Sequence, residues 1–283
     1  MAADPRALLG GASENLSAEE RARRERSREG GAGIVGYATD AAVELASFAL
    51  SGRLFTAELR AGTARELPAP GPVIDPRPSP DGRYVAFVSR GALRVVGAEG
   101  EDGHALATPE SEGVTYGLAE FVAAEEMGRS RGFWWAPESD RLLVARVDDT
   151  PVRRWWISDP AHPEREPQRV PYPAAGTPNA DVRLFVIGLD GTRTEVSWDR
   201  ARYPLPGPCA LVSGGCPAAA GPGARPARRA DPGRGPGLRG DPDGARRRRS
   251  DLAGTFPRGA LLEPFRAAGA DRGRGGRATT RRR

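Results

Sequence analysis

The sequence has only two cysteines and two histidines, and it contains no lysine. Cys209 and Cys216 are too few for a disulfide framework or, with His104 and His162, for a zinc site, so we expect no metal and no cofactor. No apolar run reaches the roughly 18 residues of a transmembrane helix, which argues against a membrane partner. The first residues lack the basic start and apolar stretch of a secretory signal, which favours a cytoplasmic location.

Tryptophan and tyrosine are missing from residues 205–283, and this absence separates two parts of the chain. The segment carries 17 Arg against 6 acidic residues, and 16 Gly and 10 Pro lie among its 79 residues. This composition is typical of low-complexity disorder, so we predict a disordered tail. Residues 1–204 carry 25 Arg and 31 acidic residues, so the tail alone makes the chain basic. Arginines attract phosphate, but without aromatics or a motif we expect no nucleic-acid partner.

Residues 16–28 predict a short charged helix near the N-terminus. Ser17 and Glu20 have the spacing of a capping box, and Glu20 lies three and four residues before two arginines. The segment has almost no apolar face and its glutamates alternate with arginines, so we expect a solvated surface helix rather than a nucleic-acid-binding one. We assign residues 1–32 to this helix and a linker.

From residue 33 onward the pattern changes to short alternating strands separated by glycine-containing turns. The clearest hairpin joins residues 43–50 and 53–59 through Ser51 and Gly52. Further strands, or strand-turn-strand units, are predicted at residues 34–39, 64–67, 84–89, 92–96, 134–147, 182–188 and 192–198. This spacing, with recurring turns of the Pro-Asp-Gly type, indicates an all-β fold made of propeller blades, and a β-sandwich is the alternative. At about 45 residues a blade only three or four blades fit, so we expect a partial β-propeller.

Five segments carry a resemblance to a known family. They are residues 79–88, 120–127, 133–137, 148–152 and 169–179, the last followed by Val182-Arg-Leu. With these segments in this order, the chain resembles the dipeptidyl peptidase IV branch of the prolyl oligopeptidase serine peptidases over residues 16–204. The resemblance implies an N-terminal propeller that covers an α/β-hydrolase domain. We therefore assign residues 33–204 to an incomplete propeller of this type.

Glu125 and Glu126 match an adjacent pair of glutamates in that family. The resemblance implies that the pair binds the free α-amino group of a peptide and so limits cleavage to dipeptides. Two carboxylates on one short segment can each accept a hydrogen bond from an ammonium group, and such charge-assisted bonds are strong. Adjacent glutamates alone are ordinary on a solvated helix, but the flanking segments favour the binding role.

Other conspicuous residues are assigned to structure. We expect packing within the blades for four tryptophans, Trp134, Trp135, Trp155 and Trp156. Asp148 and Asp149 are assigned to a turn, because no further oxygen-rich spacing supports a cation site. His104 and His162 lie in loop-like glycine and proline contexts, and we assign them no catalytic role.

A serine peptidase of this kind needs a nucleophile elbow, Gly-x-Ser-x-Gly, followed by Asp and then His. We expect no such elbow here, since Ser213 lacks the preceding glycine, and no histidine follows His162. The βαβ pattern of a hydrolase domain is also missing. We therefore assign no catalytic residue and expect the chain alone to be inactive. A separately encoded hydrolase domain stays open as a partner.

The composition changes abruptly after Pro204, where the resemblance stops. Residues 205–211 read Leu-Pro-Gly-Pro-Cys-Ala-Leu, and dropping the first C of their degenerate codons permits Tyr-Leu-Ala-Arg-Val-His-Trp, a strand that suits the family. We hypothesise one extra nucleotide near the Pro204 codon, which makes residues 205–283 an out-of-frame translation. Two functions remain open: the truncated propeller of a serine dipeptidyl aminopeptidase, which binds peptide N-termini, and a non-catalytic propeller that binds peptides or proteins.

Overall fold

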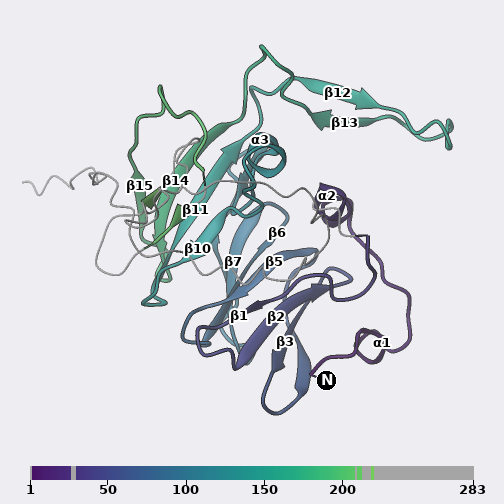
Figure 1. The fold of residues 1–283 in the computed structure, drawn as a ribbon, viewed down its shortest axis with the longest axis vertical. Coiled ribbons are helices and arrows are strands. Elements are labelled where there is room, and N and C mark those ends of the chain that lie inside the picture. Colours follow the sequence, from purple (N-terminus) through teal and green to yellow (C-terminus); the bar gives the residue numbers. More distant parts are fainter. Residues whose placement is uncertain (1, 27–29, 208, 212–217, 220–283) are drawn as a thin grey trace, which may run out of the picture.

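The computed structural model describes residues 2–26, 30–207, 209–211 and 218–219. Three larger antiparallel sheets follow one another along the chain (Figure 1). The first two are four-stranded meanders, and the third has five strands. Consecutive meanders of this kind are the blades of a propeller, so the predicted all-β partial propeller is confirmed.

The predicted strands are largely present. The first sheet contains β1 (Ala38–Thr39), β2 (Leu45–Leu50), β3 (Arg53–Glu58) and β4 (Thr63–Leu67), and the second contains β5 (Val73–Pro78), β6 (Tyr84–Ser89), β7 (Ala92–Gly97) and β8 (His104–Ala107). The third sheet contains β9 (Val114–Tyr116), β10 (Phe133–Trp135), β11 (Arg141–Asp148), β14 (Asp181–Gly188) and β15 (Arg193–Val196). The strand predicted at 34–39 is shorter than expected, because only its last two residues pair with β2.

The hairpin of β2 and β3 shows how the sequence specifies a blade. Ser51 and Gly52 both have positive φ, at 53° and 72°, as a tight two-residue turn requires. This turn sets the register in which Phe48 lies opposite Phe55, and their rings stack with centroids 5.6 Å apart. The predicted hairpin is therefore confirmed down to its turn.

The hydrophobic core lies between successive sheets. Leu54 and Leu67 of the first sheet pack against Val85 and Phe87 of the second. The other face of the second sheet packs on the third through a cluster of buried side chains, which includes Ile74, Val88, Leu93, Leu142, Val144 and Ile187. Each blade thus buries one face against the next, as the alternation of apolar residues predicts.

The outer faces of the first and third sheets are also covered. Side chains from the N-terminal segment, Leu8, Leu9 and Ile34, pack on the outer face of the first sheet. On the third sheet, Leu205, Cys209 and Leu211 are buried against Leu143, Ala145 and Leu184. The packed chain therefore continues past the boundary predicted at residue 204. Residues 212–217 and 220–283, which make up most of the predicted tail, lie outside the described residues.

Three short helices complete the described chain: α1 (Pro5–Leu8), α2 (Ala18–Arg26) and α3 (Phe121–Glu125). None of the helices in this described part is long and apolar enough to cross a membrane. In α2, the backbone N–H of Glu20 donates to Ser17 Oγ at 3.1 Å, so the predicted N-terminal cap is present. Residues 27 and 28 of the predicted helix lie outside the described residues.

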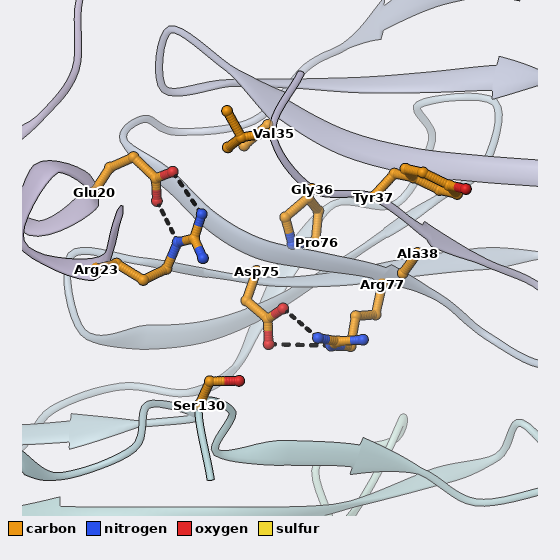
Figure 2. A pocket seen from close by; sticks show the side chains of 11 residues that line it. Glu20, Arg23, Val35, Gly36, Tyr37, Ala38, Asp75, Pro76, Arg77 and Ser130 are labelled. Carbon is orange, nitrogen blue, oxygen red and sulfur yellow. Dashed lines mark hydrogen bonds and ion pairs between the residues drawn. The ribbon is translucent and has the colours of Figure 1, made fainter. Parts of the chain in front are cut away.

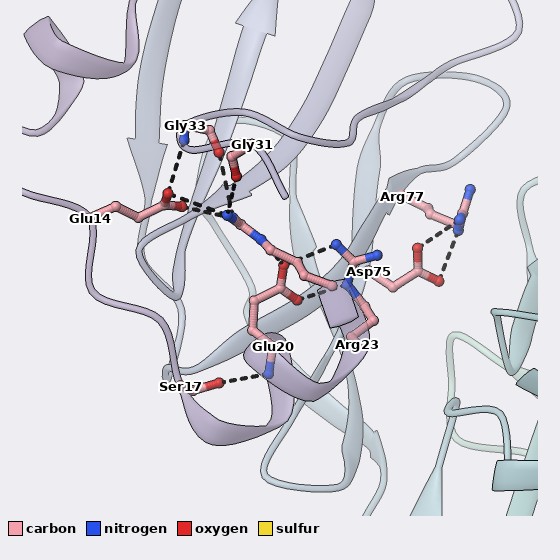
Figure 3. Close-up of polar contacts among 9 residues, drawn as sticks. Glu14, Ser17, Glu20, Arg23, Gly31, Gly33, Asp75 and Arg77 are labelled. Atoms are coloured by element: carbon pink, nitrogen blue, oxygen red, sulfur yellow. Dashed lines mark hydrogen bonds and ion pairs between the residues drawn. The ribbon is translucent and has the colours of Figure 1, made fainter. Parts of the chain in front are cut away.

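The helix α2 is docked rather than solvated, which corrects the sequence-based expectation (Figure 3). Glu20 and Arg24 are each only 5% exposed, and their side chains pair at 2.9 Å. Arg24 also pairs with Glu14 at 2.7 Å. Burial raises the pKa of the Glu14 carboxyl. Hydrogen bonds from Arg24 and from the N–H of Gly33 lower the pKa by more than burial raises it, so the pKa lies below its ordinary value. The expectation failed because Glu14 lies outside the helix, so the spacing of residues within the helix does not predict its contact with Arg24.

Cys209 offers a test of the packing beyond residue 204. Burial raises the pKa of its thiol to about 11. In a Cys216→Ser variant, Cys209 is the single thiol, and we expect its alkylation by iodoacetamide at pH 8 to be about 100-fold slower than in the same variant unfolded in urea, since only the thiolate reacts. Equal rates in the two states would show that Cys209 is not buried in the folded chain.

Candidate functional site

Glu125 and Glu126 lie together at the end of α3. Glu125 is the last residue of this helix and Glu126 is its C-cap, and both side chains are exposed. The backbone N–H of Glu126 donates to the carbonyl of Val122 at 2.9 Å, which fixes the turn that carries both carboxylates. A helix C-terminus carries partial negative charge, so the local potential favours a cation.

A buried ion pair holds both ends of α3. Glu120 directly precedes the helix and pairs with Arg129, and these side chains are 2% and 1% exposed. The Arg129 guanidinium also donates to the carbonyl of Arg131 at 3.0 Å and to that of Pro206 at 3.1 Å. Its backbone N–H donates to the carbonyl of Ala123 at 2.9 Å. Our reading of the sequence missed this pair, because nothing in the spacing of Glu120 and Arg129 indicates that they meet.

A small polar cavity of about 200 Å³ lies between α2, β5 and the segment after α3 (Figure 2). The side chains that give it its character are Glu20, Arg23, Tyr37, Asp75, Arg77 and Ser130. Glu20 pairs with Arg23 at 2.8 Å, and Asp75 pairs with Arg77 at 2.6 Å. These two ion pairs balance the charges of the acidic side chains that line the cavity. Neither Glu125 nor Glu126 lines this cavity.

The segment after α3 also corrects the expectation that the chain has no elbow pattern. Residues 128–132 read Gly-Arg-Ser-Arg-Gly and do match Gly-x-Ser-x-Gly. A nucleophile elbow turns from a strand into a helix, whereas Ser130 lies between the end of α3 and the start of β10. The side chains around Ser130 in the cavity include no histidine. The match is thus one of spacing alone, and the residues that line this cavity place no histidine beside the hydroxyl.

The four tryptophans divide into two pairs. Trp134 and Trp135 are partly buried in β10, and Trp135 Nε1 donates to the carbonyl of Arg77 at 3.1 Å, which confirms blade packing for this pair. For Trp155 and Trp156 the prediction is wrong, because their side chains are 46% and 64% exposed. They lie on β12 (Arg154–Ile157), which pairs with β13 (Gln168–Pro171) in a separate hairpin that projects from the sheets (Figure 1). We call this hairpin the arm.

The remaining candidates have local roles. Asp148 Oδ1 accepts hydrogen bonds from the backbone N–H of Thr150 at 3.0 Å and from its hydroxyl at 2.6 Å, so the predicted turn is confirmed. His104 begins β8, with Nδ1 2.8 Å from the carbonyl of Asp102. His162 lies in the arm, 3.4 Å from the Glu164 carboxylate. In the part of the chain that the structure describes, no group of three or more metal-ligating side chains is placed to hold an ion.

Comparison with known proteins shows which family this chain resembles. The family described as the dipeptidyl peptidase IV (DPP IV) N-terminal region matches residues 43–204. Dipeptidyl peptidase 4 of Felis catus is 32% identical over 117 residues, which are 40% of this chain and 15% of that protein. Inactive dipeptidyl peptidase 10 of Rattus norvegicus is 31% identical over 91 residues, which are 30% of this chain and 11% of that protein.

A solved structure agrees with the fold. The crystal structure of Porphyromonas gingivalis dipeptidyl peptidase 4 is similar with a TM-score of 0.52 at 22% identity, over 66% of this chain and 29% of that chain. The chain thus spans less than a third of the length of each of these three proteins. The family match begins just before β2, covers more than half of the chain and contains α3 and the arm. The chain belongs to the dipeptidyl peptidase IV N-terminal region family.

Proposed function

We propose that this chain is the N-terminal propeller part of a serine dipeptidyl aminopeptidase, and that Glu125 and Glu126 bind the free N-terminus of a peptide. The observation that carries the proposal is the position of two exposed carboxylates on one turn, at the end of a helix held by a buried ion pair. An ammonium group has three N–H donors in a compact volume, and two adjacent carboxylates can accept from it together.

The chemistry of the peptide sets the pH range of this binding. An α-amino group has a pKa of about 7.7–8.0, so it is charged at neutral pH and loses its charge as the pH rises further. Binding through two carboxylates should therefore weaken above about pH 8 and should be absent for a peptide whose N-terminus is acetylated. In a complete enzyme, a hydrolase domain would attack the second peptide bond of the anchored chain, and acyl transfer to its serine and then to water would release a dipeptide.

The truncation is part of the proposal, and the burial pattern after Pro204 supports it. Residues 205–207, 209 and 211 are buried, and residue 210 is exposed. The given reading puts Pro206 and Gly207 at two of the buried positions. The shifted reading puts the largely apolar residues Tyr, Leu, Ala, Val and Trp at the buried positions and His at the exposed one. Burial alternates with exposure at residues 209–211, as in a strand with one buried face.

A binding experiment tests the glutamate pair. We expect Glu125→Gln and Glu126→Gln each to weaken binding of a fluorescent Ala-Pro-Ala peptide with a free N-terminus by about tenfold, because each loses a charge-assisted hydrogen bond. Glu112→Gln, a change at an exposed glutamate before β9, is the matched control and should bind as the unchanged chain does. Equal affinity for the free and the acetylated peptide would refute the proposed role.

A second candidate is a non-catalytic propeller that binds peptides or proteins. The covered outer faces of the first and third sheets favour it, because they leave fewer apolar surfaces to drive aggregation of an incomplete propeller. A folded, monodisperse fragment of residues 1–211 that binds peptides regardless of their N-terminus would support this candidate over the first. A separately encoded hydrolase partner and the cytoplasmic location stay predictions of the sequence alone.

A further inference from the structure

The strands of the arm are not part of the three larger sheets. Its strands β12 and β13 pair with each other and with no other described strand. Its large side chains Trp155, Trp156 and Ile157 are all exposed. An isolated two-stranded hairpin is marginally stable in water, so contacts at the base of the arm determine its position.

An aromatic contact joins the base of the arm to α3. Tyr172 directly follows β13, and its backbone N–H donates to the carbonyl of Arg153 at 2.9 Å, which closes the hairpin. Its ring lies 5.2 Å from the ring of Trp155 in β12 and 5.2 Å from the ring of Phe121, the first residue of α3. The Phe121 pair is edge-to-face, with 66° between the ring planes. Tyr172 thus bridges an arm strand and the helix that carries the glutamates.

The helix α3 is too short to hold itself in place. It has five residues, whereas isolated helices shorter than about 12–15 residues are marginal in water. Its position therefore depends on tertiary contacts, which include the Glu120–Arg129 pair, the ring of Phe121, and Val122, which packs against the apolar cluster on the third sheet. The rings connect α3 to the arm, and the Arg129 guanidinium connects it to the carbonyls of Arg131 and Pro206. Tyr172 therefore supplies the ring contacts that join the arm to α3.

We infer that Tyr172 is a positioning residue that couples the arm to Glu125 and Glu126, so that the ring contacts at the base of the arm help to fix the peptide-binding carboxylates. The inference rests on the proposed function for its effect on peptides. The coupling of the arm to α3 stands on the ring geometry alone and is measured separately.

The experiment compares three variants of the full chain. Tyr172→Leu removes the ring, Tyr172→Phe keeps the ring and removes the hydroxyl, and Trp156→Leu is the matched control. Trp156 is exposed on the same arm, and its ring lies near Arg169 rather than α3. The first readout is hydrogen exchange of the backbone amides of residues 122–126, and the second is the affinity for free and acetylated Ala-Pro-Ala peptides.

We expect Tyr172→Leu to speed exchange at residues 122–126 by about tenfold, because two aromatic contacts are lost. The same variant should bind the free peptide about fivefold more weakly, with no change for the acetylated peptide. Tyr172→Phe and Trp156→Leu should match the unchanged chain in both measurements. Phe121→Leu, which removes the same contact from the helix side, should reproduce the effect and replaces Tyr172→Leu if that variant does not fold.

Three outcomes would overturn the inference: unchanged exchange in α3 in Tyr172→Leu, equal damage by Tyr172→Phe, or equal damage by Trp156→Leu. Failure of the proposed function gives a different pattern. In that case the unchanged chain binds the free and acetylated peptides equally, while the exchange measurement still decides whether the arm and α3 are coupled.

Discussion

Replacing Arg129 by methionine should lower the free energy of unfolding by about 3–5 kcal/mol. The substitution leaves the buried Glu120 carboxylate without its cation and removes the donors to the carbonyls of Arg131 and Pro206. An unpaired charge in the interior keeps its desolvation cost and loses its compensating attraction. Because small domains are stable by only about 5–15 kcal/mol, this single change removes a large part of the total.

Urea unfolding followed by tryptophan fluorescence measures the effect. Arg60→Met is the matched control, since Arg60 pairs with Glu44 at 2.8 Å while the two side chains are 83% and 52% exposed. That exposed pair should contribute less than about 1 kcal/mol. The double variant Glu120→Leu/Arg129→Met, which removes both charges, should recover much of the loss. A cost for Arg129→Met no larger than for Arg60→Met would show that the pair does not stabilise the fold.

The purified 283-residue chain should release no dipeptide from an alanyl-prolyl chromogenic amide. Acyl transfer of this kind needs a serine, a histidine base and an acid that orients it, and loss of the serine or histidine lowers turnover by about 10⁶-fold. Ser130 is the one serine with elbow spacing, and its cavity holds arginines and carboxylates but no histidine. Ser130→Ala should therefore not change any residual hydrolysis. Activity that follows the chain through further purification and disappears in Ser130→Ala would contradict this expectation.

The sequence of the gene decides between an out-of-frame translation of residues 205–283 and the given reading. Sequencing across the codons for residues 203–211 should find one base fewer in the C run near the Pro204 codon. Translation in that frame should then continue with the strand Tyr-Leu-Ala-Arg-Val-His-Trp and reach a serine, aspartate and histidine in that order. If the given frame is correct, the out-of-frame hypothesis fails, and binding by the propeller becomes the function to measure.

The strands of the blades could be predicted from sequence, because local signals agree with the tertiary fold. In β2 and β3, apolar residues bracket a Ser-Gly turn whose positive φ angles set the register. Such agreement between turn chemistry and burial specifies a hairpin without knowledge of the rest of the chain. The same reasoning placed β6, β7, β14 and β15.

The arm and the supports of the candidate site could not be predicted in this way. Large aromatic residues are usually buried, so burial within a blade was predicted for Trp155 and Trp156. The prediction is wrong because their strand lies outside the three larger sheets, where both side chains are exposed. The Glu14–Arg24 contact spans ten residues, and the contact of Arg129 with Pro206 spans 77. Glu125 and Glu126 were identified by family resemblance, and the geometry that holds them came only from the structure.

The covered faces of the outer sheets have a consequence for assembly. The described sheets form a short linear array, in which apolar clusters join the first sheet to the second and the second to the third. Side chains from flanking segments cover both outer faces. Leu205, Cys209 and Leu211 cover the outer face of the third sheet, on which a following blade would stack. A further blade that stacks on this face must therefore displace these side chains or incorporate β16 (Cys209–Ala210), which already pairs with β17 (Ala218–Ala219), as one of its strands.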